Sequence, residues 1–221
     1  MKKLNKFEIK EKNIILRADL NIPFVDGIIT EKSRIKIILP TIDNLIKGKN
    51  KIFIISHFGR PNGSKDDKYS LNFLCPILEE EFSINKVFFL DSIEDNKIQS
   101  MMSEMKPGDV CLVENIRFYS EEEKNNFNFN KNLSKNFDIY INDAFSASHR
   151  DHASIVGIPK FIPSFAGLSL INEIKNINFF INNPVKPNLA IIGGSKVSTK
   201  IDLLNNLIDT FDSIIIGGAM A

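Results

Sequence analysis

Seven short runs of apolar and β-branched residues recur along the chain, each closed by polar or glycine-rich residues. They cover residues 13–18, 51–55, 86–90, 110–113, 138–141, 189–192 and 213–216. Runs of this length and composition are typical of strands buried on both faces. Amphipathic stretches with helical periodicity lie between several of them, at 34–47, 70–82, 168–181 and 197–210. The alternation of strand and helix predicts a mostly parallel sheet.

This order of elements predicts an α/β fold in three layers, a Rossmann-like parallel sheet with helices on both faces. Pro40 and Pro76 lie inside two of the helical stretches and are expected to kink or shorten them. Two asparagines and two prolines within residues 182–187 are expected to end a helix before a new strand begins.

These signals predict a division of the chain into three parts. We expect a first α/β domain over 1–168, an interdomain helix and linker over 169–186, and the first strand–helix–strand of a second α/β domain over 187–221. Two parallel strands and one helix leave an apolar face uncovered, so the last part is expected to be incomplete.

The charge balance and the cysteine content argue against several classes of protein. The 28 Lys and Arg nearly balance the 27 Asp and Glu, so the chain lacks the positive field of a dedicated nucleic-acid binder. Cys75 and Cys111 lie in apolar runs without the spacing of a disulfide framework or a metal site, which favours the reducing cytoplasm. No apolar run approaches the ~20 residues that span a bilayer, so we expect a protein that does not enter a membrane.

Arginine is scarce and unevenly placed. Of the 28 basic residues 23 are lysine, so positions that carry arginine are candidates for needing its planar guanidinium. The arginines and histidines all fall at or near the ends of predicted strands or the start of the first predicted helix: Arg17, Arg34, Arg60, Arg117, Arg150, His57, His149 and His152. Ligands of open α/β sheets bind at the carboxyl ends of the strands. The pattern predicts a site for a small, multiply anionic ligand.

Some of these residues have a structural interpretation that competes with the functional one. Asp19 lies two residues after Arg17, and a structural ion pair is the favoured interpretation of Arg17 over a contact with the ligand. His149 and His152 are read as part of a capped turn in preference to a metal pair, and no metal site is predicted. Residues 120–123 read as a capping box that opens a helix, and residues 79–81 as a solvated helix end.

A glycine-rich turn at 193–200 leads from a predicted strand into a predicted helix. Lys196 and Lys200 stand four residues apart, which stacks two ammonium groups over one helix start, a suitable geometry for polyphosphate. The glycine spacing fits neither a Walker A loop nor a dinucleotide-binding loop.

Five motifs of the sequence resemble those of the phosphoglycerate kinase family. They are Arg-Ala-Asp-Leu-Asn-Ile-Pro at 17–23, Ser-His-Phe-Gly-Arg-Pro at 56–61, Glu-Asn-Ile-Arg-Phe at 114–118, Asn-Asp-Ala-Phe-Ser-Ala-Ser-His-Arg at 142–150 and Gly-Gly-Ser-Lys-Val-Ser-Thr-Lys-Ile at 193–201. The resemblance covers essentially the whole chain and implies reversible phosphoryl transfer between 1,3-bisphosphoglycerate and ADP, giving 3-phosphoglycerate and ATP in glycolysis.

The resemblance also implies roles for individual residues. The positions that match the family's phosphoglycerate contacts are Asp19, Asn21, Arg34, His57, Arg60, Arg117 and Arg150. Arg34 and Lys196 are the expected catalytic residues, Arg34 facing the acyl phosphate or carboxylate and Lys196 the transferring group. Lys196 and Lys200 are expected to bind the nucleotide. Mg²⁺ is expected to accompany ATP or ADP, held mainly by the nucleotide and by residues beyond this chain.

Members of the family are longer than this chain, and the rest carries most of their nucleotide pocket. We therefore expect a monomeric, cytoplasmic kinase by family, whose 221 residues alone lack turnover. The alternative is a truncated, non-catalytic module that binds 3-phosphoglycerate or another anion. Nucleic-acid binding is disfavoured by the neutral charge balance.

Overall fold

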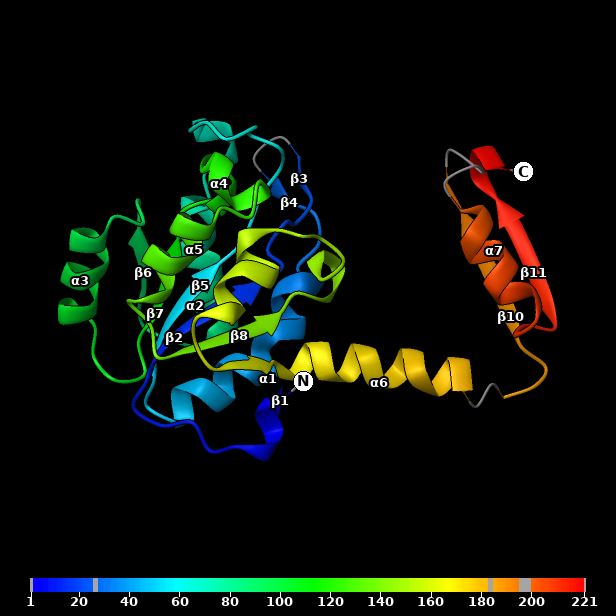
Figure 1. Cartoon of the computed structure of the whole chain (residues 1–221), viewed down its shortest axis with the longest axis horizontal. Coiled ribbons are helices and arrows are strands. Elements are labelled where there is room, and N and C mark those ends of the chain that lie inside the picture. Colours follow the sequence, from blue (N-terminus) through cyan, green and yellow to red (C-terminus); the bar gives the residue numbers. More distant parts are fainter. Residues whose placement is uncertain (1, 26–27, 183–184, 195–199, 221) are drawn as a thin grey trace. The chain divides into compact units, whose positions relative to one another are not determined.

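The computed structural model describes residues 2–25, 28–182, 185–194 and 200–220. The chain divides into two units, Met1–Ile171 and Asn172–Ala221. Figure 1 shows the elements of both.

The first unit is built on a seven-stranded sheet with the order β1-β9-β8-β2-β5-β7-β6. Every neighbouring pair in it is parallel. The strands are β1 Lys2–Lys3, β2 Asn13–Ala18, β5 Lys51–Ile55, β6 Val87–Leu90, β7 Val110–Val113, β8 Ile139–Asp143 and β9 Ser164–Ala166. The apolar runs at 13–18, 51–55 and 110–113 match their strands residue for residue, which confirms the expected Rossmann-like parallel sheet.

Helices cover both faces of this sheet. They are α1 Ser33–Lys47, α2 Cys75–Phe82, α3 Asp95–Glu104, α4 Ser120–Glu123, α5 Phe127–Ser134 and the start of α6 Leu168–Asn182. Short 3₁₀ turns lie at Leu4–Lys6, Asp67–Tyr69, Asn72–Leu74, Ile116–Phe118, Phe145–Ala147 and Ile158–Lys160, and a π turn at Ala153–Gly157. A small antiparallel hairpin, β3 Phe24–Val25 with β4 Ile28–Ile29, follows the first long strand.

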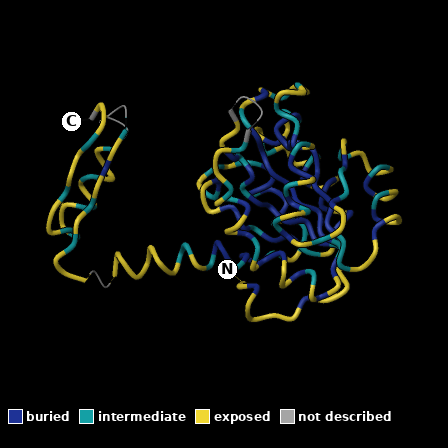
Figure 2. Tube along the Cα trace, turned by 180° about the vertical axis from the view of Figure 1, so that it is seen from behind, coloured by how far each residue is buried: buried dark blue, intermediate teal, exposed yellow. Residues whose placement is uncertain are grey.

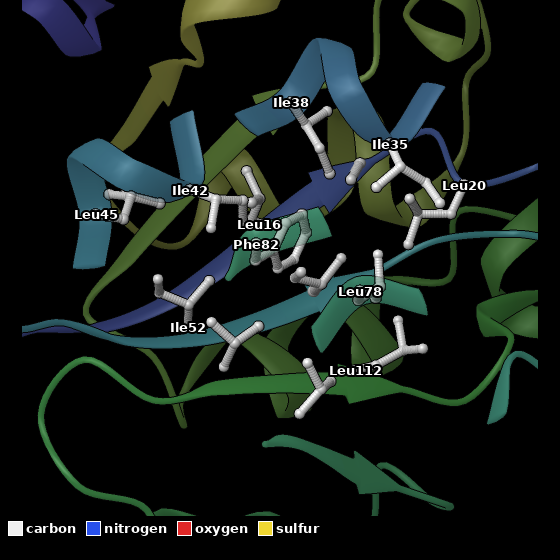
Figure 3. Packing of buried hydrophobic residues seen from close by; sticks show 14 of the residues in the cluster. Leu16, Leu20, Ile35, Ile38, Ile42, Leu45, Ile52, Leu78, Phe82 and Leu112 are labelled. Atoms are coloured by element: carbon white, nitrogen blue, oxygen red, sulfur yellow. The ribbon is translucent and has the colours of Figure 1, made fainter. Parts of the chain in front are cut away.

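The alternation of side chains along each strand divides the core into two clusters. On one face, Leu16, Ile52 and Leu112 pack with residues of α1 and α2, as Figure 3 shows. On the other face, Ile15 and Phe53 pack with residues of α3 and α5. All five of these side chains are fully or almost fully buried. The sheet is therefore the middle layer of three, and its strands are buried on both sides as the continuous apolar runs predicted.

The two helical prolines behave differently. Pro76 falls in the first turn of α2, where a missing amide costs nothing, and the helix begins at Cys75 instead of residue 70. Pro40 lies inside α1, which runs unbroken from Ser33 to Lys47, so the expectation that Pro40 shortens this helix is wrong. Pro40 and Lys36, whose carbonyl loses its helical partner, are both exposed, so this carbonyl is not left without a partner in the core.

The second unit contains a parallel pair, β10 Leu189–Gly193 and β11 Ser213–Gly217, joined through α7 Ile201–Ile208. A 3₁₀ turn at Gly218–Met220 follows. Asp212 links the segments that precede the two strands. Its carboxylate accepts hydrogen bonds from the Asn188 amide at 2.9 Å and from Lys186 Nζ at 2.9 Å. Among the described residues of this unit, Ile192 is the one buried side chain, and the trace in Figure 2 is mostly exposed there. Within the part of the chain that the structure describes, no helix is long and apolar enough to cross a membrane.

Candidate anion-binding site

The arginine-bearing motifs meet at the carboxyl edge of the seven-stranded sheet. In register, Arg17 of β2 stands beside Ile55 of β5 on one side and Asn142 of β8 on the other. Because neighbouring strands are parallel, the segments that follow them emerge at the same edge. The loops at 19–23, 56–63 and 144–152 are therefore neighbours, although they lie far apart in the sequence.

Asp19 joins three segments at this edge. Its Oδ2 accepts hydrogen bonds from Arg34 Nη1, in the first turn of α1, and from Ser146 Oγ, in the loop after β8. Its Oδ1 accepts from the Asn21 amide at 3.1 Å, a turn that aspartate commonly makes with its own backbone. The Asp19 carboxylate thus holds the Arg34 guanidinium at the edge of the sheet, with about two-fifths of the Arg34 side chain exposed.

Arg17 is buried beneath this edge and does not hydrogen-bond with Asp19. It is 2% exposed, and it donates from Nε to Ser154 Oγ at 3.0 Å and from Nη2 to His57 Nδ1 at 3.0 Å. Ser154 in turn donates from its amide and hydroxyl to the buried Glu122 carboxylate. The prediction that Arg17 pairs with Asp19 is therefore wrong, because Arg17 contacts Ser154 and His57 instead. Arg17 lies within β2, on the face covered by Glu122 and Ser154, whereas Asp19 lies beyond the end of the strand.

His57 lies at the centre of the positive charge. Its pKa is lowered to about 3, first by burial and then by the charges of Arg17, Arg150, Arg34 and His152, which act in the same direction. Each of these groups disfavours a second positive charge on the imidazole. His57 is therefore a neutral ring at physiological pH, surrounded by guanidinium groups.

The glycine loop after β5 is held from two sides. Asn21 Oδ1 accepts from the Gly59 amide at 2.9 Å, and Arg117 Nη1 donates to the Gly59 carbonyl at 3.0 Å. Gly59 has φ +60°, and a β-carbon there would come within 2.5 Å of the Tyr69 ring. Arg117 is itself buried and also pairs with Glu123, at 3.2 Å between Nε and Oε1. Two predicted ligands, Asn21 and Arg117, thus fix the backbone that precedes a third, Arg60.

Arg60 and Arg150 are the two arginines whose side chains form no hydrogen bond with the described residues. Arg60 is exposed, and its guanidinium makes no hydrogen bond to the described residues. Arg150 is half-buried, and its buried Nε has no partner among the residues that the structure describes. The structure brings Arg34, Arg150 and His57 together. It places Asn21 and Arg117 at the neighbouring loop.

The glycine-rich turn of the second unit is described only in part. Lys196 lies outside the described residues, as do Ser195 and 197–199. Lys200 precedes the first turn of α7, and its Nζ donates to the Gly193 carbonyl at the end of β10. The expected stacking of the two lysines is therefore untested.

Residues 120–123 differ from the capping box that the sequence predicts. The helix α4 does begin at Ser120, but Tyr119 is the capping position and no side chain caps the helix. Because Ser120 lies within the helix, its hydroxyl does not reach the amides that a cap would satisfy. Glu122 is 1% exposed, whereas Glu123 is exposed and pairs with Arg117. At residues 79–81, Glu79 accepts from the Val87 amide at 2.8 Å and Glu81 pairs with Lys32.

Sequence reasoning missed three polar residues beneath the site, namely Glu122, Ser154 and Tyr140. Tyr140 donates from its hydroxyl to the Ser154 carbonyl at 2.6 Å. The one signal in the sequence was a serine that follows the His-Arg-Asp-His run, and it is too weak to select Ser154. Over residues 2–25, 28–182, 185–194 and 200–220, no three His, Cys, Asp or Glu side chains are grouped closely enough to hold a metal ion.

Comparisons with known proteins agree with the motifs. The sequence model of the family described as phosphoglycerate kinase matches residues 4–221. The phosphoglycerate kinase of Wolbachia pipientis subsp. Culex pipiens is 45% identical over 214 residues, which cover 97% of this chain and 54% of that protein. The phosphoglycerate kinase of Coprothermobacter proteolyticus is 40% identical over 214 residues, which cover 96% of this chain and 54% of that protein.

Solved structures give the same result. The phosphoglycerate kinase of Pyrococcus horikoshii OT3 superposes with a TM-score of 0.89 at 31% identity, covering all of this chain and 56% of the other. That of Coxiella burnetii superposes with a TM-score of 0.82 at 35% identity, covering 98% and 54%. The chain therefore spans about half the length of the relatives it matches. These relatives support the kinase interpretation of the motifs and not the non-catalytic alternative.

Proposed function

Because the chain belongs to the phosphoglycerate kinase family, we propose that its first unit binds 3-phosphoglycerate and 1,3-bisphosphoglycerate at the carboxyl edge of the sheet. The reaction is reversible phosphoryl transfer between 1,3-bisphosphoglycerate and ADP in glycolysis, catalysed by a phosphotransferase with a carboxyl group as acceptor.

The convergence of positive charge on one neutral imidazole supports this proposal. Arg34 and Arg150 come from separate elements, and both act on His57 strongly enough to lower its pKa. A phosphoglycerate carries a phosphate, a carboxylate and a hydroxyl, and guanidinium groups match the first two with paired hydrogen bonds. The unpartnered Nε of Arg150 and the exposed Arg60 are available to such a ligand within the described part of the chain.

Each residue has a proposed role. Arg34 faces the acyl phosphate or carboxylate, and Asp19 and Asn21 hold a hydroxyl or the arginines around it. His57, Arg60, Arg117 and Arg150 complete the phosphoglycerate site. Positioning and charge neutralisation are the protein's main contribution, because in-line phosphoryl transfer needs no covalent intermediate on the enzyme.

The second unit is proposed to contact the nucleotide. Lys196 faces the transferring group, and Lys196 and Lys200 meet the phosphates of ATP or ADP. Mg²⁺ accompanies the nucleotide and neutralises phosphate charge when bound. The proposed domains are the phosphoglycerate domain at 1–168, the interdomain helix and linker at 169–186, and the start of the nucleotide domain at 187–221. A monomer in the cytoplasm is the proposed state.

Calorimetric titration of the 221-residue chain with 3-phosphoglycerate tests the proposal, after circular dichroism has shown that the chain is folded. Inorganic phosphate at the same concentrations is the control ligand. Saturable binding that phosphate does not reproduce is the expected result. Three or four charge-assisted hydrogen bonds, each worth roughly 1.5–3 kcal/mol, correspond to micromolar to millimolar affinity. A folded chain without binding would contradict the proposal.

A further inference from the structure

The contact between Arg17 and His57 determines where the imidazole carries its proton. Arg17 Nη2 lies 3.0 Å from His57 Nδ1. A guanidinium only donates hydrogen bonds, so Nδ1 must be the acceptor and carry a lone pair. A neutral imidazole has one N–H, and in this arrangement it is the Nε2–H.

Two further buried residues, Ser154 and Glu122, hold Arg17 in this position. Its Nε donates to Ser154 Oγ at 3.0 Å, and the single hydroxyl proton of Ser154 is then directed to Glu122. The Ser154 amide donates to the second oxygen of the same carboxylate at 2.8 Å. The donors run in one direction, from Arg17 through Ser154 to Glu122, and all three residues are buried. Glu122 also supplies the negative charge that makes burial of the Arg17 guanidinium tolerable.

The surroundings of His57 keep the ring neutral without selecting a tautomer. The charged or titratable groups that face it are Arg17 from β2, Arg34 from α1, and Arg150 and His152 from the loop after β8. All of them oppose a second proton. Only Arg17 makes a hydrogen bond to a ring nitrogen among the described residues. The choice between the two neutral forms therefore rests on this contact.

We propose that Arg17 is a positioning residue that fixes His57 as the Nε2–H tautomer, so that the imidazole presents an N–H donor to the anion, and that Ser154 and Glu122 hold Arg17 for this task. The tautomer follows from the geometry of the Arg17–His57 contact, whereas donation to phosphoglycerate rests on the proposed function.

Nitrogen-15 NMR of the labelled imidazoles in the 221-residue chain tests the tautomer directly. The His57→Gln variant assigns the His57 signals among the three histidines. We expect a protonated Nε2 and an unprotonated Nδ1 at pH 7, with no titration of His57 down to about pH 4.5. A proton on Nδ1, or a mixture of the two forms, in the unmodified chain would overturn the inference whatever the variants do.

The double variant Arg17→Met/Glu122→Gln removes the hydrogen-bond donor and its buried countercharge together. This avoids leaving one charge unpaired in the core. We expect mixed His57 tautomers and titration of His57 at higher pH than in the unmodified chain. Phosphoglycerate affinity should fall about tenfold, the size of one hydrogen bond to a charged group. Ser154→Ala, which leaves the Arg17–His57 contact in place, serves as the second variant, and we expect a smaller change in the same direction. An unchanged tautomer in the folded double variant would overturn the inference.

The two readouts separate this inference from the proposed function. A fixed Nε2–H tautomer in a chain that does not bind 3-phosphoglycerate would support the positioning role and contradict the proposed ligand. Binding of 3-phosphoglycerate by a chain with mixed His57 tautomers would support the ligand and contradict the positioning role.

Discussion

A β-carbon on Gly167 would lie 2.3 Å from Asp143 Oδ1 and 2.4 Å from Asp143 Cγ. Asp143 ends β8, and its buried carboxylate accepts from the Leu170 amide at 2.9 Å in the first turn of α6. The Leu168 amide donates to Thr41 Oγ1 of α1, also at 2.9 Å. The first amides of a helix lack partners within it, so these two side chains complete the start of α6. Gly167 leaves the space in which Asp143 does so.

Gly167→Ala should destabilise the first unit by about 1–3 kcal/mol, because the added methyl group overlaps a carboxylate fixed by the sheet. Gly167 does not have a positive φ, so the collision is the main effect of the change. Gly217→Ala is the matched control, since no atom lies within 4 Å of its β-carbon. Urea unfolding followed by circular dichroism compares the two. Equal midpoints for Gly167→Ala and the unmodified chain would contradict the prediction.

Glu122→Ala should cost about 3–5 kcal/mol of folding free energy, because it leaves the buried Arg17 guanidinium without its countercharge. Glu121→Ala, one residue earlier and exposed, should change stability by less than about 0.5 kcal/mol. Thermal or urea unfolding of both variants checks this. Similar effects at the two positions would show that Glu122 does not compensate Arg17.

Arg60→Lys should weaken 3-phosphoglycerate binding by more than about 1 kcal/mol, because an ammonium group does not reproduce paired guanidinium hydrogen bonds. Arg60 is exposed, so folding stability should stay unchanged. Lys49→Ala, in the turn before β5 and hence at the opposite edge of the sheet, should leave binding unaltered. Calorimetric titration measures all three chains. Unchanged affinity of Arg60→Lys would place the site elsewhere.

Acid should destabilise the chain through His57. Its pKa is about 3 in the folded protein, below the ordinary value of 6.5 that the unfolded chain has. Above pH 6.5 both states are neutral at this residue and the contribution is fully present. As the pH falls from 6.5 towards 3, the unfolded chain binds a proton that the folded chain does not, and stability is lost at up to about 1.4 kcal/mol per pH unit.

The His57→Gln variant isolates this contribution, because its other titrating groups are the same. We expect its free energy of unfolding to fall less steeply between pH 6.5 and pH 4.5 than that of the unmodified chain. Urea unfolding at several pH values in this range measures both slopes. Parallel slopes would mean that His57 takes up a proton as easily in the folded state as in the unfolded one.

Much of the first unit follows from local patterns. The strands at 13–18, 51–55 and 110–113 were predicted with their observed ends, because each is a continuous apolar run closed by polar residues. The short strand β9 Ser164–Ala166 and the helices α3 and α5 were not predicted. Three residues are too few for a pattern. The two helices are rich in polar residues, and packing against the sheet stabilises them more than their own sequence does.

The sequence by itself determined that the few arginines lie near strand ends and at one helix start, and that a parallel sheet gathers their loops at one edge. The tertiary structure alone decided their partners. Arg17 contacts Ser154 and His57, residues 137 and 40 positions away in the chain, in place of the nearby Asp19. The reason is physical: once a side chain is buried in a strand, the groups on the facing layer determine how its charge is compensated, and sequence distance carries no information about them.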